Sequence, residues 1–248
     1  MNSPTDHIVT APTETTTDFG RLYLAIRERE KRVYTDAEVS RLPDIDLLHP
    51  HYAEWQTRKR SAARLINYLH KKQRPLNILE VGCGNGWLAA KIADIPRANV
   101  TGIDINLVET DQAERVFRKE NLRFICGRFD DINLNGQLFD VIVFAAVLPY
   151  FASVTGILKL ALSHLYPGGE LHILDTPFYT AEETGPARER CIAYYNRMGF
   201  PEMSGQYFHH TINELEGFNY RVLFSPRSLV NRLTNKDRFP WICITGRS

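Results

Sequence analysis

The sequence lacks a surplus of either charge and lacks any long apolar run. Its 248 residues include 30 lysines and arginines against 29 aspartates and glutamates. Because strong binding of DNA or RNA relies on clustered cations, this balance argues against nucleic acid as a partner. The longest apolar run, Val141 to Leu148, has eight residues, whereas a membrane helix needs about 20. We therefore expect no membrane association.

Cysteine is also scarce, at four residues in the whole chain. The four are widely spaced, with neither a C-x-x-C pair nor the spacing of zinc ligands: Cys83, Cys126, Cys191 and Cys243. This pattern indicates reduced thiols and predicts no metal site. The N-terminus has neither the basic segment nor the apolar core of a secretory signal, so we expect a cytoplasmic protein.

Three kinds of segment follow one another along the chain. Residues 1–18 are rich in Thr, Pro and Ser, which predicts a disordered tail, and residues 19–73 carry helical patterns. From residue 74 to residue 248, short apolar strands alternate with helices, with strands expected at 76–82, 99–104, 122–126, 139–145, 170–176, 220–224 and 241–246. The alternation predicts an α/β fold, a Rossmann-like doubly wound sheet of seven mostly parallel strands with a helical N-terminal extension.

The most informative motif lies between the first strand and its helix. It places Gly82, Gly84 and Gly86 in five residues, where glycine allows a tight turn and a close approach of backbone to ligand. The helix that follows offers unpaired N–H groups. The second strand ends in Asp104, whose carboxylate is placed to accept hydrogen bonds from a ribose diol. Together these features predict a ligand that contains a nucleoside.

Glu80 decides which nucleoside is expected, because it stands just ahead of the first glycine. A carboxylate there would repel a pyrophosphate and would favour an ammonium or sulfonium group. With Glu80 ahead of G-x-G-x-G, Asp104, the segment FDVIVFAAVLPY and the turn LYPGGELHI, residues 50–176 resemble the class I S-adenosylmethionine-dependent methyltransferases. The flanks RVYTDAEVSRLP, YYNRMGFPEM and YFHH resemble uncharacterised bacterial members with a type 11-like core.

The resemblance implies S-adenosylmethionine as cofactor and S-adenosylhomocysteine as product. It implies cofactor-binding roles for eleven residues: Glu80, Gly82, Cys83, Gly84, Gly86, Asp104, Ile105, Phe129, Asp130, Ala145 and Ala146. Within that set Glu80 would hold the amino group, and the two alanines would line the sulfonium. Many members have Gly-Asp after the third strand, with the aspartate near the adenine amino group. This chain has Gly127-Arg128 there, so Asp130 is expected to supply the acid that contacts the adenine.

The acceptor site is expected beyond the fifth strand, in an insertion at about residues 177–217. This insertion is rich in tyrosine and histidine, which can line a pocket for planar groups and take a proton from a hydroxyl. His209, His210 and Asp175 are the candidate bases, and Tyr194 and Tyr207 are the candidate substrate-binding residues. We therefore expect methyl transfer to a small molecule, at a hydroxyl oxygen. The sequence does not indicate the oligomeric state.

Two other functions remain open at this point. A non-catalytic protein that binds the nucleoside would share the same fold, and the departure at Arg128 keeps this alternative. A nicotinamide-dependent oxidoreductase is the third reading, although both Glu80 and the glycine spacing disfavour it. A further hypothesis is that Trp55 and Arg58 of the helical extension close the cofactor pocket.

Overall fold

The computed structural model describes residues 18–226, 228, 231 and 237–246. The tail predicted over residues 1–18 therefore lies outside the described residues, except for its last position. None of the helices among the described residues is both long enough and apolar enough to cross a membrane.

Seven strands form one sheet in the order β3-β2-β1-β4-β5-β7-β6. Strands β1 to β5 pair in parallel, and β7 runs antiparallel to both β5 and β6. The strand bounds are β1 Leu76–Val81, β2 Ala98–Asp104, β3 Leu122–Cys126, β4 Phe139–Ala145, β5 Leu165–Leu174, β6 Tyr220–Phe224 and β7 Trp241–Thr245. This arrangement confirms the predicted doubly wound, mostly parallel sheet.

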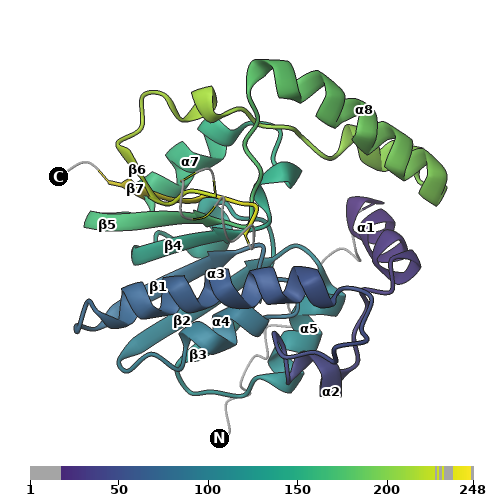
Figure 1. Cartoon of the computed structure of the whole chain (residues 1–248). Coiled ribbons are helices and arrows are strands. Elements are labelled where there is room, and N and C mark those ends of the chain that lie inside the picture. The colour runs from purple at the N-terminus through teal and green to yellow at the C-terminus, as the bar shows by residue number, and fades with distance from the viewer. Residues whose placement is uncertain (1–17, 227, 229–230, 232–236, 247–248) are drawn as a thin grey trace, which may run out of the picture.

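Helices lie on both faces of the sheet and extend beyond one end of it. Among the described residues, the α-helices whose bounds are described are α1 Asp18–Arg29, α2 Asp36–Val39, α3 Tyr52–His70, α4 Trp87–Ile92, α5 Leu107–Val116, α6 Asp131–Leu134, α7 Val154–Ser163 and α8 Ala181–Met198. Three short 3-10 helices are η1 Leu148–Tyr150, η2 Pro201–Gly205 and η3 Ile212–Leu215. In Figure 1, α3 crosses the near face of the sheet, and α1 and α8 lie at the same end of the molecule.

The central strand β4 explains why both faces are covered. Its apolar residues alternate between two cores, since successive side chains of a strand point to opposite faces. Val141 and Val143 pack with residues of α3 and α4, whereas Ile142 and Phe144 pack with residues of α7. A strand that is apolar at every buried position can only be stable with helices on both sides.

Helix ends follow local signals in the sequence. Asn106 caps α5 by accepting hydrogen bonds from the N–H groups of Val108 and Glu109, and Thr180 forms a capping box with Glu183 at the start of α8. The fifth strand was expected to begin after the Pro-Gly-Gly turn, but β5 already begins at Leu165. Leu165 pairs with Phe139, and the next pair joins Glu170 to Val141. The Pro-Gly-Gly turn therefore forms a bulge within the strand and does not precede it.

A third, smaller core joins α1 to α8. Ile26 of α1 packs with Tyr195 of α8 and with Met203, and Tyr23, Tyr150 and other partly buried side chains surround them. Helix α1 and the insertion between β5 and β6 are thus held together although they are far apart in sequence. They cover the edge of the sheet where the parallel strands end.

Candidate active site

A cavity of about 790 Å³ lies at the carboxyl ends of β1, β2 and β4; we call it the first cavity. Its lining includes eight of the eleven residues expected to bind cofactor: Gly82, Gly84, Asp104, Ile105, Phe129, Asp130, Ala145 and Ala146. The carboxyl ends of parallel strands meet at this edge, which is where open α/β sheets bind ligands. The structure thus brings most of the predicted cofactor residues together around one space.

The backbone conformation of the motif and the space around it both require glycine at these positions. All have positive φ, and a Cβ on Gly82 would lie 2.2 Å from Val147 Cγ2. A Cβ on Gly86 would lie 2.5 Å from Phe124 Cζ. Gly86 is absent from the lining of the first cavity, so its role is close packing of α4 on the sheet.

Cys83 also points away from the first cavity. Its side chain is buried in the core, and a Cβ on Gly102 of β2 would lie 2.8 Å from the Cys83 Sγ. The sequence position of Cys83 between two lining glycines did not reveal this orientation. Only the backbone of this residue can be close to a ligand.

Asp104 connects the two loops that border the first cavity. Its Oδ2 accepts a hydrogen bond from Gly84 N at 2.9 Å, and its Oδ1 accepts one from Asn106 N at 2.9 Å. Each carboxylate oxygen keeps a second lone pair for a ribose hydroxyl. Burial raises the pKa of Asp104, while these two backbone hydrogen bonds oppose the rise.

Glu80 lies beneath the glycine turn with only 3% of its surface exposed. Its Oε2 is buried and has no hydrogen-bond partner among the described residues. Burial, aided by the nearby charge of Asp104, raises the pKa of Glu80 to about 8 despite a hydrogen bond from the backbone of Ala89. An unpartnered buried carboxyl fits a cationic group of the ligand, because a cation would stabilise its charged form.

A third acid in the first cavity was not expected from the sequence. Glu109 of α5 lines the first cavity, and its Oε2 would lie 3.1 Å from a Cβ on Gly84. Burial and the charge of Asp104 raise the pKa of Glu109 to about 7. In the sequence, this residue has the appearance of an ordinary acid in the first turn of a helix.

Helix α1 supplies lining residues that the sequence did not indicate. Phe19, Tyr23 and Arg27 recur at a spacing of one helical turn and line the first cavity. The Arg27 guanidinium donates to Tyr23 Oη at 2.6 Å. Trp55 and Arg58 of α3 also line the first cavity, which is the position expected for residues that close it.

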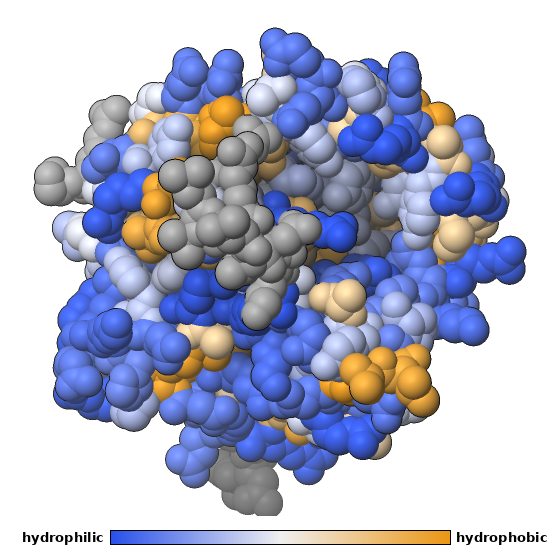
Figure 2. Space-filling view, in the orientation of Figure 1, coloured by the Kyte–Doolittle hydropathy of each residue, from blue (hydrophilic) through white to orange (hydrophobic). Residues whose placement is uncertain are grey.

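A second cavity of about 1230 Å³ lies between α3, α8 and the carboxyl end of β5. Ala146 and Tyr150 line both cavities, so the two spaces meet at the end of β4. Tyr194, Tyr207, His209 and Asp175 line the second cavity. In the space-filling view, the surface is hollowed beneath α8, and the walls of the hollow are mostly hydrophilic (Figure 2).

The two histidines of the insertion are in different surroundings. His209 meets Tyr207 edge to face and Tyr179 at a tilt, with ring centroids 5.4 and 5.5 Å away, and burial lowers its pKa. His210 lines neither cavity. Its Nε2 lies 3.0 Å from the Phe151 carbonyl oxygen, and its Nδ1 lies 3.2 Å from Glu214 Oε2. These contacts give His210 a structural position that ties the insertion to the segment after β4.

Asp175 lies at the tip of β5 in a left-handed conformation, with a φ of 51°, and Ala146 at the tip of β4 has a φ of 59°. A residue other than glycine pays about 1–2 kcal/mol for this conformation, which is frequently found at functional sites. Ser61 Oγ donates to Asp175 Oδ2 at 2.8 Å. Burial raises the pKa of Asp175 to about 6, and the charge of Arg58 limits the rise.

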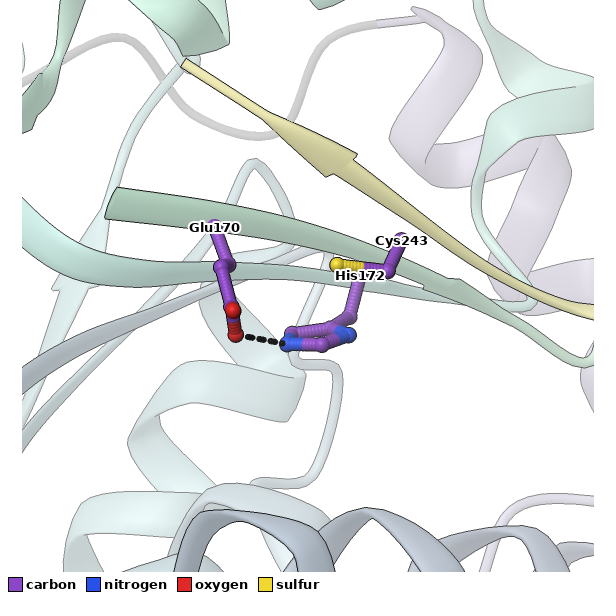
Figure 3. A group of neighbouring side chains, drawn as sticks. All are labelled: Glu170, His172 and Cys243. Atoms are coloured by element: carbon purple, nitrogen blue, oxygen red, sulfur yellow. Dashed lines mark ion pairs between the residues drawn. The ribbon is translucent and has the colours of Figure 1, made fainter. Parts of the chain in front are cut away.

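One further group of side chains has the composition of a metal site. Glu170, His172 and Cys243 hold their ligand atoms within 4.8 Å of one another, with His172 Nε2 3.3 Å from Glu170 Oε2 (Figure 3). However, Lys72 Nζ lies 2.8 Å from Glu170 Oε2, and Trp241 Nε1 donates to His172 Nδ1 at 3.1 Å. The ammonium group opposes a cation, and the Trp241 bond places the proton of a neutral imidazole on Nε2. We interpret the group as a structural polar network.

The fold and the site together define a class I methyltransferase architecture, and comparisons with known proteins agree. Residues 78–169 match the family described as "Methyltransferase domain". The chain is 30% identical over 123 residues to the malonyl-[acyl-carrier protein] O-methyltransferase of Halalkalibacterium halodurans, which covers 46% of this chain and 45% of that protein. It is 27% identical over 192 residues to a sterol 24-C-methyltransferase of Saccharomyces cerevisiae, at 73% of this chain and 48% of that protein. The chain thus spans about half the length of the curated relatives it matches.

Solved structures share the fold across nearly the whole chain. The magnesium protoporphyrin IX methyltransferase of Synechocystis, solved with bound S-adenosylmethionine, superposes with a TM-score of 0.58 at 14% identity and covers 95% of this chain and 100% of its own. The plantazolicin methyltransferase BpumL, solved with S-adenosylhomocysteine, has a TM-score of 0.51 at 16% identity and covers 92% of this chain and 100% of its own. The chain thus has the fold of the class I S-adenosylmethionine-dependent methyltransferases, and residues 78–169 are similar to a methyltransferase domain.

Proposed function

We propose that the protein transfers the methyl group of S-adenosylmethionine to a hydroxyl oxygen of a small molecule in the cytoplasm. The observation that carries the proposal is the junction of the two cavities at Ala146 and Tyr150. The residues of the first cavity fit the cofactor, and the second cavity opens beside the expected position of the sulfonium. An acceptor in the second cavity would therefore meet the methyl group at the end of β4.

The residues of the first cavity supply recognition. Asp104 is placed for the ribose hydroxyls. Glu80 does not line the first cavity, but it lies buried beneath the glycine turn, where the charge of the ligand's amino group would compensate its carboxylate. Phe129 and Ile105 supply apolar surface for the adenine. When bound, S-adenosylmethionine would supply an electrophilic methyl group: an acceptor oxygen would bond to the methyl carbon, and the sulfur would leave with the electron pair of the broken C–S bond. Alignment and exclusion of water provide most of the catalysis of such a displacement.

Asp175 is the base that the geometry favours. It lines the second cavity next to Ala146, because Ala146 N donates to the carbonyl of Leu174 at 3.0 Å. A pKa of about 6 leaves the carboxylate ionised at neutral pH and still basic enough to accept a hydroxyl proton. His209 is the second candidate, since it lines the same cavity, and Tyr194 and Tyr207 would contact the acceptor.

The test is methyl transfer from labelled S-adenosylmethionine to a panel of hydroxylated small molecules, compared with Asp175→Asn. We expect the variant to lose about 10²- to 10⁴-fold in kcat while its affinity for S-adenosylhomocysteine is unchanged. The wild-type rate should rise as the pH increases through about 6, because Asp175 must be ionised to accept the proton, and the variant should lack this inflection. Equal rates and equal pH profiles would remove Asp175 as the base.

The alternatives give different results in the same experiment. A non-catalytic nucleoside-binding protein would bind S-adenosylmethionine and transfer no methyl group to any acceptor. A nicotinamide-dependent oxidoreductase would bind NAD instead, and the unpartnered carboxyl of Glu80 opposes the pyrophosphate of that cofactor. The relatives named above methylate oxygen in one case and carbon in the other, so the choice of oxygen rests on Asp175 and on the surroundings of His209.

A further inference from the structure

The second cavity has a continuous aromatic wall. Tyr150 and Tyr207 meet edge to face with ring centroids 5.6 Å apart, and Tyr207 continues to His209 and then to Tyr179. On the other side, Tyr194 and Tyr195 are in contact, with centroids 5.2 Å apart. Such a wall presents ring faces and edges to a bound molecule, which favours a planar aromatic acceptor.

The same cavity has an excess of positive charge. Seven arginines line it against three carboxylates, those of Glu30, Glu54 and Asp175. Both glutamates are already occupied: Arg32 lies 3.1 Å from Glu30 and also pairs with Glu54, and Arg58 lies 3.0 Å from Glu54. The carboxylates therefore neutralise the arginines of α1 and α3 and leave those on the opposite side of the cavity.

Three arginines lie on that opposite side: Arg190 and Arg197 of α8 and Arg238 of the segment before β7. Among the described residues, none of the three has an ion pair with a carboxylate. Arg197 lies over the ring of Tyr194, 5.9 Å from its centroid, which leaves Arg190 and Arg238 for a ligand. Arg190 acts electrostatically on Tyr179 and on His209, so its charge is close to the aromatic wall. Guanidinium groups in such a place match the paired oxygens of a carboxylate or phosphate.

The first cavity holds acids beside its arginines. Asp104, Glu109 and Asp130 line it together with Arg27, Arg32, Arg58 and Arg128. Three of these arginines also line the second cavity, namely Arg27, Arg32 and Arg58. Arg190 and Arg238 are thus cations that line the second cavity alone.

We propose that the acceptor is an anionic aromatic molecule, a planar ring that carries a carboxylate or phosphate group held by Arg190 and Arg238. The inference rests on the proposed function, because it identifies the acceptor class of the same site. The aromatic wall orients the ring toward Ala146 and Asp175, and the two arginines hold the anionic end away from the reacting oxygen. A volume of about 1230 Å³ accommodates an acceptor larger than one ring.

The experiment measures binding of matched probes to the protein saturated with S-adenosylhomocysteine. The anionic probes are 4-hydroxycinnamate, 6-hydroxy-2-naphthoate and phenyl phosphate, and the neutral probes are the amides of the two acids and phenol. The proteins are the wild type, the double variant Arg190→Gln/Arg238→Gln and the control Arg118→Gln. Arg118 is an exposed arginine after α5 that lines neither cavity.

We expect the wild type and the control to bind the anions about tenfold more tightly than their neutral counterparts. The double variant should lose this preference, and added salt should reduce it in the wild type. If the wild type binds S-adenosylhomocysteine and shows no preference for the anions, or if Arg118→Gln loses the preference equally, this inference fails while the proposed function stands. If the protein does not bind S-adenosylhomocysteine, the proposed function fails and this inference fails with it.

Discussion

The binding role proposed for Glu80 conflicts with the stability of the free protein. The unfolded chain ionises this carboxyl near its ordinary pKa of 4.5, whereas burial raises the pKa to about 8 in the folded protein. Between these values the folded state binds the proton more tightly than the unfolded state does. Folding stability therefore falls as the pH rises from about 4.5 to about 8. A bound cation reverses this cost, since it stabilises the ionised form.

The variant Glu80→Gln separates the two effects. Between pH 4.5 and pH 8 the free energy of unfolding of the variant should fall by roughly 2–4 kcal/mol less than that of the wild type. Urea unfolding of the free protein at several pH values measures this difference. The substitution should also weaken binding of S-adenosylmethionine by about 10- to 100-fold, because the amide carries no charge. An unchanged pH dependence of stability together with unchanged affinity would contradict the role given to Glu80.

Sequence reasoning at the scale of single residues succeeded where position along a strand determines the environment. Asp104 and Ala146 line the first cavity because they stand at strand ends, and strand ends can be read from the sequence. Orientation around a tight turn could not be read in the same way. Cys83 and Gly86 lie inside the glycine motif, yet the left-handed turn directs them to the core. Glu109 was missed because an acid in the first turn of a helix is common without any function.

The elements around the first strand depend on close packing between α4 and the sheet. Gly86 has a φ of +75°, and the nearest atoms to an added Cβ would belong to Phe124 and Ala113, at 2.5 and 2.7 Å. The Cβ of Ala113 is fixed to the backbone, so it cannot move away unless α5 moves. Glycine is thus required at this turn, because Gly86 lies where the start of α4 meets β3 and α5.

Gly86→Ala should destabilise the protein by roughly 2–4 kcal/mol, which combines overpacking with the cost of a left-handed alanine. Gly136→Ala is the matched control, because Gly136 has a φ of +69° and no atom within 4 Å of an added Cβ. The control should lose only about 1 kcal/mol. Urea unfolding of both variants makes the comparison, and equal losses would show that packing at Gly86 is unimportant.

The order of strands and helices was predictable because each element carries its own local signal. The apolar run of β4 and the caps of α5 and α8 all appear in the sequence. The predicted start of β5 was wrong. The Pro-Gly-Gly segment indicates a turn, and only the pairing of Leu165 with Phe139 includes this segment in the strand. Local patterns therefore predicted which elements exist better than where each one ends.

At the scale of the whole molecule, the site is assembled from three distant parts of the chain. Helix α1, the start of α3 and the insertion with α8 converge on the carboxyl edge of the sheet (Figure 1). Their contact through Ile26, Tyr195 and Met203 depends on tertiary packing. No periodicity in the sequence connects these segments, which is why Tyr23 and Arg27 were not predicted as lining residues. The position of Arg190 and Arg238 on one side of the second cavity is likewise a property of the assembled molecule.

The central claim is that the first cavity binds S-adenosylmethionine through Asp104. The most direct measurement is calorimetric titration of the protein with S-adenosylmethionine, S-adenosylhomocysteine and NAD, repeated with Asp104→Ala and with the exposed control Asp111→Ala on α5. Circular dichroism melting would establish that each variant is folded. We predict micromolar binding of the two sulfur nucleosides and none of NAD, with affinity lowered at least about 30-fold by Asp104→Ala and unchanged by Asp111→Ala. Binding of NAD alone, binding of none of the three, or equal affinity in the folded Asp104→Ala variant would contradict the account.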